Sequence, residues 1–316
     1  MPRSVTVIDL GVAAVAAPSF VVYVLVLATL SRHRKKPPLG SSFYRLSAAL
    51  GCVDVCALLV LHALVQPAEL GLALEAFFLP NGAWLAPAVV SVWLCCVVVQ
   101  NVGVALVALN RLMAVRWPAL FRRFWAPGRL RYVLASLFAS GLWLPPTVFL
   151  HMRPHYSVDN STVLVMRITN PIGRPISAVI FACILVSFCA YSLAFWSLRS
   201  HRKGVGPLVV SVQTKTGSTR ADAVAPKKTT PRSPTQRPSP IEIRLLVCGF
   251  VFFVAQLLMA VGMAIKARAP LDETSNQLLL VAYACGFCVN PYSLLATSSD
   301  LRAAFARTIR CLPAAA

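Results

Sequence analysis

Residues 84–110 read WLAPAVVSVWLCCVVVQNVGVALVALN, and Arg111 follows them directly. The stretch contains no Asp, Glu, Lys or Arg. A helix needs about 20 apolar residues to cross the hydrocarbon core of a bilayer, because each residue advances it by about 1.5 Å. The segment therefore predicts a membrane-spanning helix whose polar end begins at Asn110.

Six further apolar stretches of similar length lie on both sides of this one, at residues 10–30, 43–64, 132–150, 175–198, 241–265 and 276–297. The whole chain is 58% hydrophobic and only 13% charged, far from a soluble domain. We predict an all-α membrane protein, a seven-transmembrane helix bundle occupying residues 10–297. Pro145 and Pro146 are expected to kink the fourth helix.

The basic residues predict the orientation of the bundle. With the N-terminus outside, 24 of the 30 Lys and Arg residues lie on the cytoplasmic side and 6 lie outside. Cytoplasmic segments carry such an excess, so we expect a multi-pass plasma-membrane protein with a short extracellular N-terminus, residues 1–9. This placement accounts for the net charge of +20 without nucleic acid. The third cytoplasmic loop, about 199–240, is rich in Pro, Ser, Thr, Lys and Arg and is predicted to be disordered.

After the seventh span, residues 298–316 are expected to form a cytoplasmic amphipathic helix and tail. Leu301, Phe305, Ile309 and Leu312 recur at helical spacing, which is typical of a helix on the membrane surface. Ser299 or Asp300 can cap its start. Cys311 is placed either for palmitoylation or to remain an unmodified thiol.

Two polar features interrupt the spans. Arg111 can extend from the helix end to the membrane interface, or it can act as a switch for a partner protein, and its position alone fits both readings. Asp54 is the only acid deep inside a span, where a carboxylate is costly unless it is paired or hydrated. Asp54 is therefore a functional candidate. Gln100 and Asn290 lie at similar depth in two other spans, and a purely structural tie between the helices is the alternative.

The set of motifs resembles the rhodopsin-like G-protein-coupled receptors, and most closely the nematode serpentine chemoreceptors of classes gamma and v. The resemblance covers the chain except its third cytoplasmic loop. It rests on motifs in each part of the chain, namely Pro18-Ser19 with Tyr23, Ser42-Phe43-Tyr44-Arg45-Leu46 before Asp54, Asn110-Arg111 with Pro118 and Trp125, Glu242-Ile243-Arg244-Leu245-Leu246, and Asn290-Pro291-Tyr292 with Ser299-Asp300-Leu301-Arg302.

The resemblance implies a chemosensory receptor that binds an extracellular small-molecule or peptide ligand and activates a heterotrimeric G protein. It implies a coupling switch made of Asn110, Arg111, Tyr191, Asn290, Pro291 and Tyr292. It also implies a sodium-linked cluster of Asp54 with Gln100 and Asn290.

Several positions depart from the wider rhodopsin-like pattern. Asn110 replaces the usual acid, so protonation at that position cannot trigger the receptor. Leu294 stands where a tyrosine usually follows Asn-Pro, and Leu246 to Lys266 contains no proline, so the usual outward swing of helix six is in doubt. No cysteine lies near Ala86 or in loop 151–174 to form the usual outer disulfide.

The ligand is expected in the outer half of the bundle. Counted back from Arg111 at helical spacing, Trp93, Cys96, Val97 and Gln100 share one face of the third helix. The residues that can face them from other helices are Ser177, Phe181, Gln256, Gln277 and Tyr283. Taken singly, most of them are better explained as packing residues than as ligand contacts. The absence of an acid on the face of the third helix argues against a protonated amine ligand.

The alternative function is a small-solute membrane transporter or channel, which would need several buried charges along a path, whereas only Asp54 qualifies. No enzyme and no cofactor are indicated: residues 276–297 lack the lysine that a retinal Schiff base needs, and the cysteines show no metal-ligand spacing. Asn160 in Asn160-Ser161-Thr162 is predicted to be glycosylated.

Overall fold

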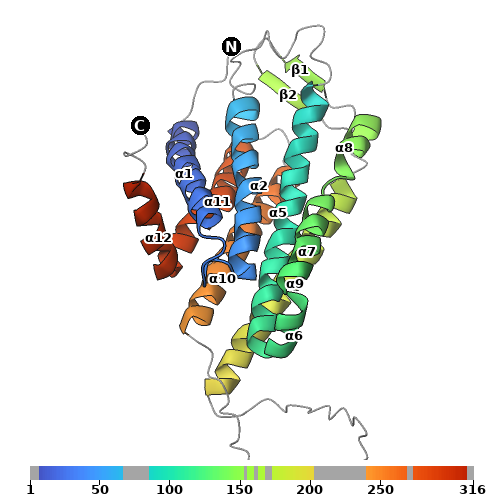
Figure 1. The fold of residues 1–316 in the computed structure, drawn as a ribbon. Helices are drawn as coiled ribbons and strands as arrows, with labels where there is room; N and C mark the ends of the chain where they lie inside the picture. The colour runs from blue at the N-terminus through green and yellow to red at the C-terminus, as the bar shows by residue number, and fades with distance from the viewer. Residues whose placement is uncertain are drawn as a thin grey trace, which may run out of the picture.

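The computed structural model describes residues 7–66, 85–152, 155–159, 163–167, 173–202, 240–268 and 273–311. Within them, seven helices are long and apolar enough to cross a membrane. They are built from α1 (Val7–Arg32), α2 (Ser42–Val60) with a π-helical turn over Leu61–Val65, α5 (Leu85–Arg116), α7 (Pro127–Ala139) with its continuation, α9 (Gly173–Arg202), α10 (Pro240–Arg268) and α11 (Glu273–Thr297). The predicted seven-helix bundle is confirmed (Figure 1).

Helix α5 is the central helix of the bundle. It packs against α2, α9 and α10, and Figure 1 shows it extending from beside the strands β1 and β2 to α6. Val107 and Ala108 near its inner end are fully buried. The helix continues six residues past the predicted end at Asn110, to Arg116, because no breaker interrupts it before Trp117-Pro118.

The fourth span is broken before its prolines and not kinked at them. Helix α7 ends at Ala139, Ser140–Trp143 form a turn, and α8 (Leu144–Thr147) begins with Pro145 in its first turn, where a missing N–H costs nothing. A π-helical turn over Val148–Met152 follows. At the break, Gly141 lies so close to α5 that a Cβ there would come within 2.9 Å of a Val99 methyl group.

Two short elements were not anticipated from the sequence. Helix α6 (Pro118–Phe124) follows α5, and an antiparallel hairpin pairs β1 (His155–Asp159) with β2 (Val163–Arg167) between the fourth and fifth spans. Asn160, the predicted glycosylation site, lies outside the described residues, as do residues 203–239 of the loop predicted to be cytoplasmic and residues 1–6 at the N-terminus.

The predicted surface helix is α12 (Ser299–Arg310), which turns away from the end of α11 (Figure 1). Its cap is Ser298, whose Oγ accepts the N–H of Leu301 at 3.1 Å, and not Ser299 or Asp300. Leu301 and Ala304 are buried against the bundle, whereas Cys311 at the end of the helix is exposed. Leu312 lies outside the described residues.

Candidate functional site

A buried carboxylate in the middle of the bundle ties three other helices to α2. Asp54 is 1% exposed. It accepts the hydroxyl of Tyr23 from α1 at 2.6 Å, the amide Nε2 of Gln100 from α5 at 2.8 Å, and the amide Nδ2 of Asn290 from α11 at 3.1 Å. The predicted cluster of Asp54, Gln100 and Asn290 is therefore assembled in the structure, with Tyr23 as a fourth member.

Tyr23 lies between two acceptors. Its hydroxyl oxygen is 2.6 Å from Asp54 Oδ2 and 2.5 Å from the carbonyl oxygen of Phe287 on α11. A tyrosine carries one hydroxyl hydrogen, so it can donate to only one of these oxygens. A proton on Asp54 would supply the hydrogen for the other contact, with Tyr23 then donating to the carbonyl. The geometry thus accommodates a neutral Asp54 as well as a charged one.

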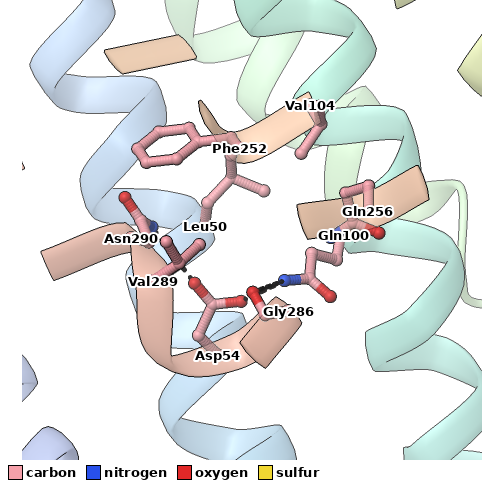
Figure 2. Close-up of a pocket in the computed structure, with 9 residues that line it drawn as sticks. All are labelled: Leu50, Asp54, Gln100, Val104, Phe252, Gln256, Gly286, Val289 and Asn290. Atoms are coloured by element: carbon pink, nitrogen blue, oxygen red, sulfur yellow. Dashed lines mark hydrogen bonds between the residues drawn. The ribbon is translucent and has the colours of Figure 1, made fainter. Parts of the chain in front are cut away.

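Beside the carboxylate lies a small cavity with a volume of about 10 Å³. Figure 2 shows the residues that line it, with Asp54, Gln100, Gln256 and Asn290 as its polar members. The amide oxygens of Gln100, Gln256 and Asn290 are buried without a hydrogen-bond partner among the described residues. A volume of this size holds about one water or one small ion.

The second polar feature is Arg111 near the C-terminal end of α5. Its side chain is 4% exposed. The guanidinium donates through Nε to Asn110 Oδ1 at 3.1 Å, makes a second, shorter contact through its terminal nitrogen to the same oxygen, and lies 4.6 Å from the ring centroid of Phe43 on α2. Asn110 in turn donates to Ser42 Oγ at 2.9 Å. Neutral groups thus provide these contacts, and they connect α5 to the start of α2.

The other members of the predicted coupling switch lie in separate places. Tyr191 on α9 is 1% exposed, and its hydroxyl has no hydrogen-bond partner among the described residues; it occupies the space that a Cβ on Gly249 of α10 would need. Asn290 belongs to the Asp54 cluster. Pro291 is buried within α11, whereas Tyr292 is half exposed and its hydroxyl lies 3.1 Å from Ser19 Oγ on α1.

Aromatic rings fill much of the predicted ligand region. The ring centroids of Trp93 and Tyr283 are 4.6 Å apart, and Phe287 stands 5.5 Å from Trp93. Cys96 and Val97 are buried in the hydrophobic core behind these rings. Gln256 lies instead at the small cavity beside Asp54. The structure therefore brings Trp93 and Tyr283 together and places Gln256 beside Asp54.

Two residues expected to face inward from α9 do not. Ser177 is exposed and Phe181 is 69% exposed, so both lie on the side of α9 that is turned away from the bundle. Gln277 is half-buried. An apolar side chain on the lipid side of a helix is as favourable as one in the core, which is why the sequence did not distinguish the two faces.

Sequence reasoning missed three residues of these sites. Tyr23, Ser42 and Phe43 were noted only as parts of motifs. The signal for Tyr23 was available, since a tyrosine hydroxyl inside an apolar span needs a partner and Asp54 is the one acid at that depth. No comparable signal marked Phe43, because its cation–π contact with Arg111 depends on how α2 packs on α5.

A comparison with known families supports the arrangement as a whole. The model of the family described as serpentine type 7TM GPCR chemoreceptor Srv matches residues 13–311, which include nearly all of the seven spans and all of α12. No curated protein matches the chain.

Proposed function

The chain belongs to the serpentine type 7TM GPCR chemoreceptor family Srv, and from that premise we propose that it binds an extracellular small-molecule or peptide ligand and activates a heterotrimeric G protein. Membership makes it a multi-pass membrane chemoreceptor, and of the two classes that its motifs resemble the match is to class v. The ligand, the G protein, the plasma membrane and the outside N-terminus are parts of the proposal.

The observation that carries the coupling proposal is the state of Arg111. A buried guanidinium at the inner end of the central helix, held by an amide oxygen and an aromatic face, can be released by small movements of α2 and α5. Once released, the five N–H donors of an arginine are suited to the carbonyl oxygens at the end of a partner's helix.

The distribution of buried charge argues against transport. Among the described residues, the buried charged side chains are Asp9, Asp54 and Arg111. They come from the start of α1, the middle of α2 and the end of α5, and they do not form a continuous polar path. A transporter or channel that moves polar solutes needs such a path.

We also propose that the Asp54 cluster holds a sodium ion in the resting receptor. The supporting observation is the pair of buried amide oxygens, on Gln100 and Asn290, that lack partners although their amide nitrogens bond to Asp54. Rotating either amide by half a turn exchanges nitrogen for oxygen and presents an oxygen ligand beside the carboxylate. Oxygen ligands and a negative charge are what a hard cation requires.

The test uses the full chain in vesicles with a purified G-protein heterotrimer. A panel of small organic compounds and short peptides is added outside, and nucleotide exchange on the G protein is recorded. The flux of the active compound across the membrane of the same vesicles is then measured. We expect exchange without flux. Flux without exchange would overturn the receptor assignment in favour of a transporter or channel.

A further inference from the structure

A large hollow lies on the surface beside the inner ends of α1 and α2, with a volume of about 710 Å³. Its walls come from α1, from the segment that joins α1 to α2, from α2 itself and from α7. Because the spans face lipid, a hollow at this place is filled by membrane components and not by bulk water alone.

The part of the hollow that faces the membrane interior is apolar. Its walls include Leu27, Ala48, Ala49, Leu134 and Phe138. The small side chains of Ala48 and Ala49 leave space on α2 between the larger residues of α1 and α7. On α2 the hollow extends from Tyr44 to Cys52, about 12 Å at the rise of an α-helix.

The other end of the hollow is basic. Arg34, Lys35 and Arg45 line it, and no acidic residue is among the lining residues. Arg34 and Lys35 are exposed and Arg45 is half-buried. Within the part of the chain that the structure describes, none of the three side chains has a hydrogen bond or an ion pair to protein, so their charges are left for another molecule.

We propose that this groove is a specific binding site for an anionic phospholipid. One acyl chain lies along the apolar wall, and the phosphate and acidic headgroup bind the three cations. This lipid site goes beyond the proposed receptor function, and the proposed orientation decides only which leaflet supplies the lipid. With the N-terminus outside, the site opens to the cytoplasmic leaflet, where anionic lipids are concentrated.

Other occupants match only half of the groove. A sterol or a neutral phospholipid covers the apolar wall and leaves three cations without net counter-charge. A soluble phosphate compound or an acidic peptide neutralises the cations and leaves the apolar wall uncovered. An anionic lipid satisfies both parts, since its charge and its acyl chain are joined at the depth of the membrane interface.

The experiment measures lipid retention on the full chain. The chain is reconstituted with phosphatidylcholine and a minor share of phosphatidylserine of identical acyl chains, extracted in mild detergent and examined by native mass spectrometry. We expect one phosphatidylserine to be retained in preference to phosphatidylcholine. The variant Arg34→Gln/Lys35→Gln/Arg45→Gln should lose this preference by roughly a hundredfold, as expected for three cations at about 1 kcal/mol each.

The control Arg122→Gln/Arg123→Gln/Arg310→Gln removes the same charge from exposed cations elsewhere. It should retain the lipid. Equal loss in both triple variants, or equal retention of the two lipids by the wild type, would overturn the site. A phosphatidylserine signal displaced equally well by soluble glycerophosphoserine would show a headgroup site without the acyl groove.

A second pair of variants tests the apolar half with all charges intact. Ala49→Trp fills the groove and should lower phosphatidylserine retention at least severalfold. Ala182→Trp places the same side chain on an exposed face of α9 and should have no effect. Undiminished retention by Ala49→Trp would contradict the groove. Because no ligand or G protein takes part, a failure here is separate from a failure of the receptor assignment.

Discussion

At the scale of single residues, Arg111 is buried and contacts two uncharged side chains, Asn110 and Phe43. An exposed arginine that merely reached the membrane interface would be dispensable. Arg111 is instead enclosed by Asn110 and Phe43, which fix its side chain in one position. We expect this arrangement to hold the resting state and to open for the partner protein.

The first prediction follows from this position. Arg111→Ala should leave ligand binding near the wild-type level, because the residue lies at the opposite end of α5 from the proposed ligand region, and should abolish nucleotide exchange on the G protein. Arg116→Ala, one and a half turns further along the same helix, is the matched control and should keep signalling. A folded Arg111→Ala variant with full exchange activity would show that the guanidinium has no part in coupling.

The second prediction concerns Asp54 and sodium. An ion held with Gln100 and Asn290 would tie α2, α5 and α11 together, so a ligand that favours the active state must compete with it by linkage. Replacing sodium with a large organic cation at constant ionic strength should raise agonist affinity about 5- to 150-fold, which corresponds to a typical coupling of 1–3 kcal/mol.

Asp54→Asn should remove this dependence, since it keeps the shape of the side chain and loses the charge. Asp9→Asn, at the buried acid of α1, should keep the dependence. If the agonist affinity of the wild type does not change when sodium is replaced, the sodium site is ruled out. Asp54 would then remain, in its neutral or its charged form, as a hydrogen-bonded tie of α2 to α1, α5 and α11.

At the scale of the elements, the junction of α11 and α12 is fixed by hydrogen bonds of two side chains. Ser298 Oγ accepts the N–H of Leu301 and also the hydroxyl of Tyr44 from α2 at 2.7 Å. Arg302 donates to the carbonyl oxygens of Leu295 and Ala296, both at 2.7 Å, which satisfies the end of α11. The surface helix is thereby attached to the bundle at its first turn.

The third prediction tests this attachment. Ser298→Ala should destabilise α12 by about 0.5–2 kcal/mol through the lost cap. It also leaves the buried hydroxyl of Tyr44 without its partner. Amide hydrogen exchange over residues 299–310 should accelerate. Ser299→Ala removes an exposed hydroxyl that caps nothing and should exchange like the wild type; faster exchange in both variants, or in neither, would be inconsistent with the cap.

Length and hydropathy were sufficient to predict the seven helices, because a span must be long and apolar whatever it packs against. They were not sufficient to orient α9, where Ser177 and Phe181 point away from the bundle. In water, a polar face marks the outer side of a helix. In lipid both faces are apolar, so that signal is missing.

The polar positions were more informative than the apolar ones. Asp54, Gln100 and Asn290 were grouped from their similar depth together with the family resemblance, since a polar group in hydrocarbon must find a partner. The break in the fourth span, by contrast, depends on the close approach of Gly141 to Val99 on another helix. No local pattern reveals such a contact, so the bend was assigned to Pro145 and Pro146, about one helical turn later.

At the scale of the whole molecule, the orientation in the membrane rests on charge. The fourth prediction is that Asn160 carries a glycan, because an outside N-terminus places the loop after the fourth span in the compartment where glycosylation occurs. Glycosidase should increase the gel mobility of the wild type and leave Asn160→Gln unchanged.

A sequon introduced on the other side supplies the control. Val209→Asn creates Asn-Val-Ser in the third cytoplasmic loop, and we expect it to remain unmodified in the Asn160→Gln background. A glycan at that position would reverse the proposed orientation. An unmodified Asn160 together with a glycan at 209 would be the clearest contradiction.

The basal activity of a receptor without ligand depends on how strongly its resting conformation is favoured. The buried hydroxyl of Tyr191 destabilises that conformation. A buried hydroxyl without a partner costs about 1–3 kcal/mol, and a rearrangement of α9 or α10 that supplies one recovers this free energy. The hydroxyl of Tyr191 therefore raises the basal rate of nucleotide exchange. Tyr191→Phe should lower basal nucleotide exchange by up to about tenfold, for about 1.4 kcal/mol recovered, whereas the exposed Tyr132→Phe should not. Unchanged or raised basal exchange would remove the argument. With lower basal exchange, the Tyr191→Phe variant would give a detectable response at a lower ligand concentration than the wild type.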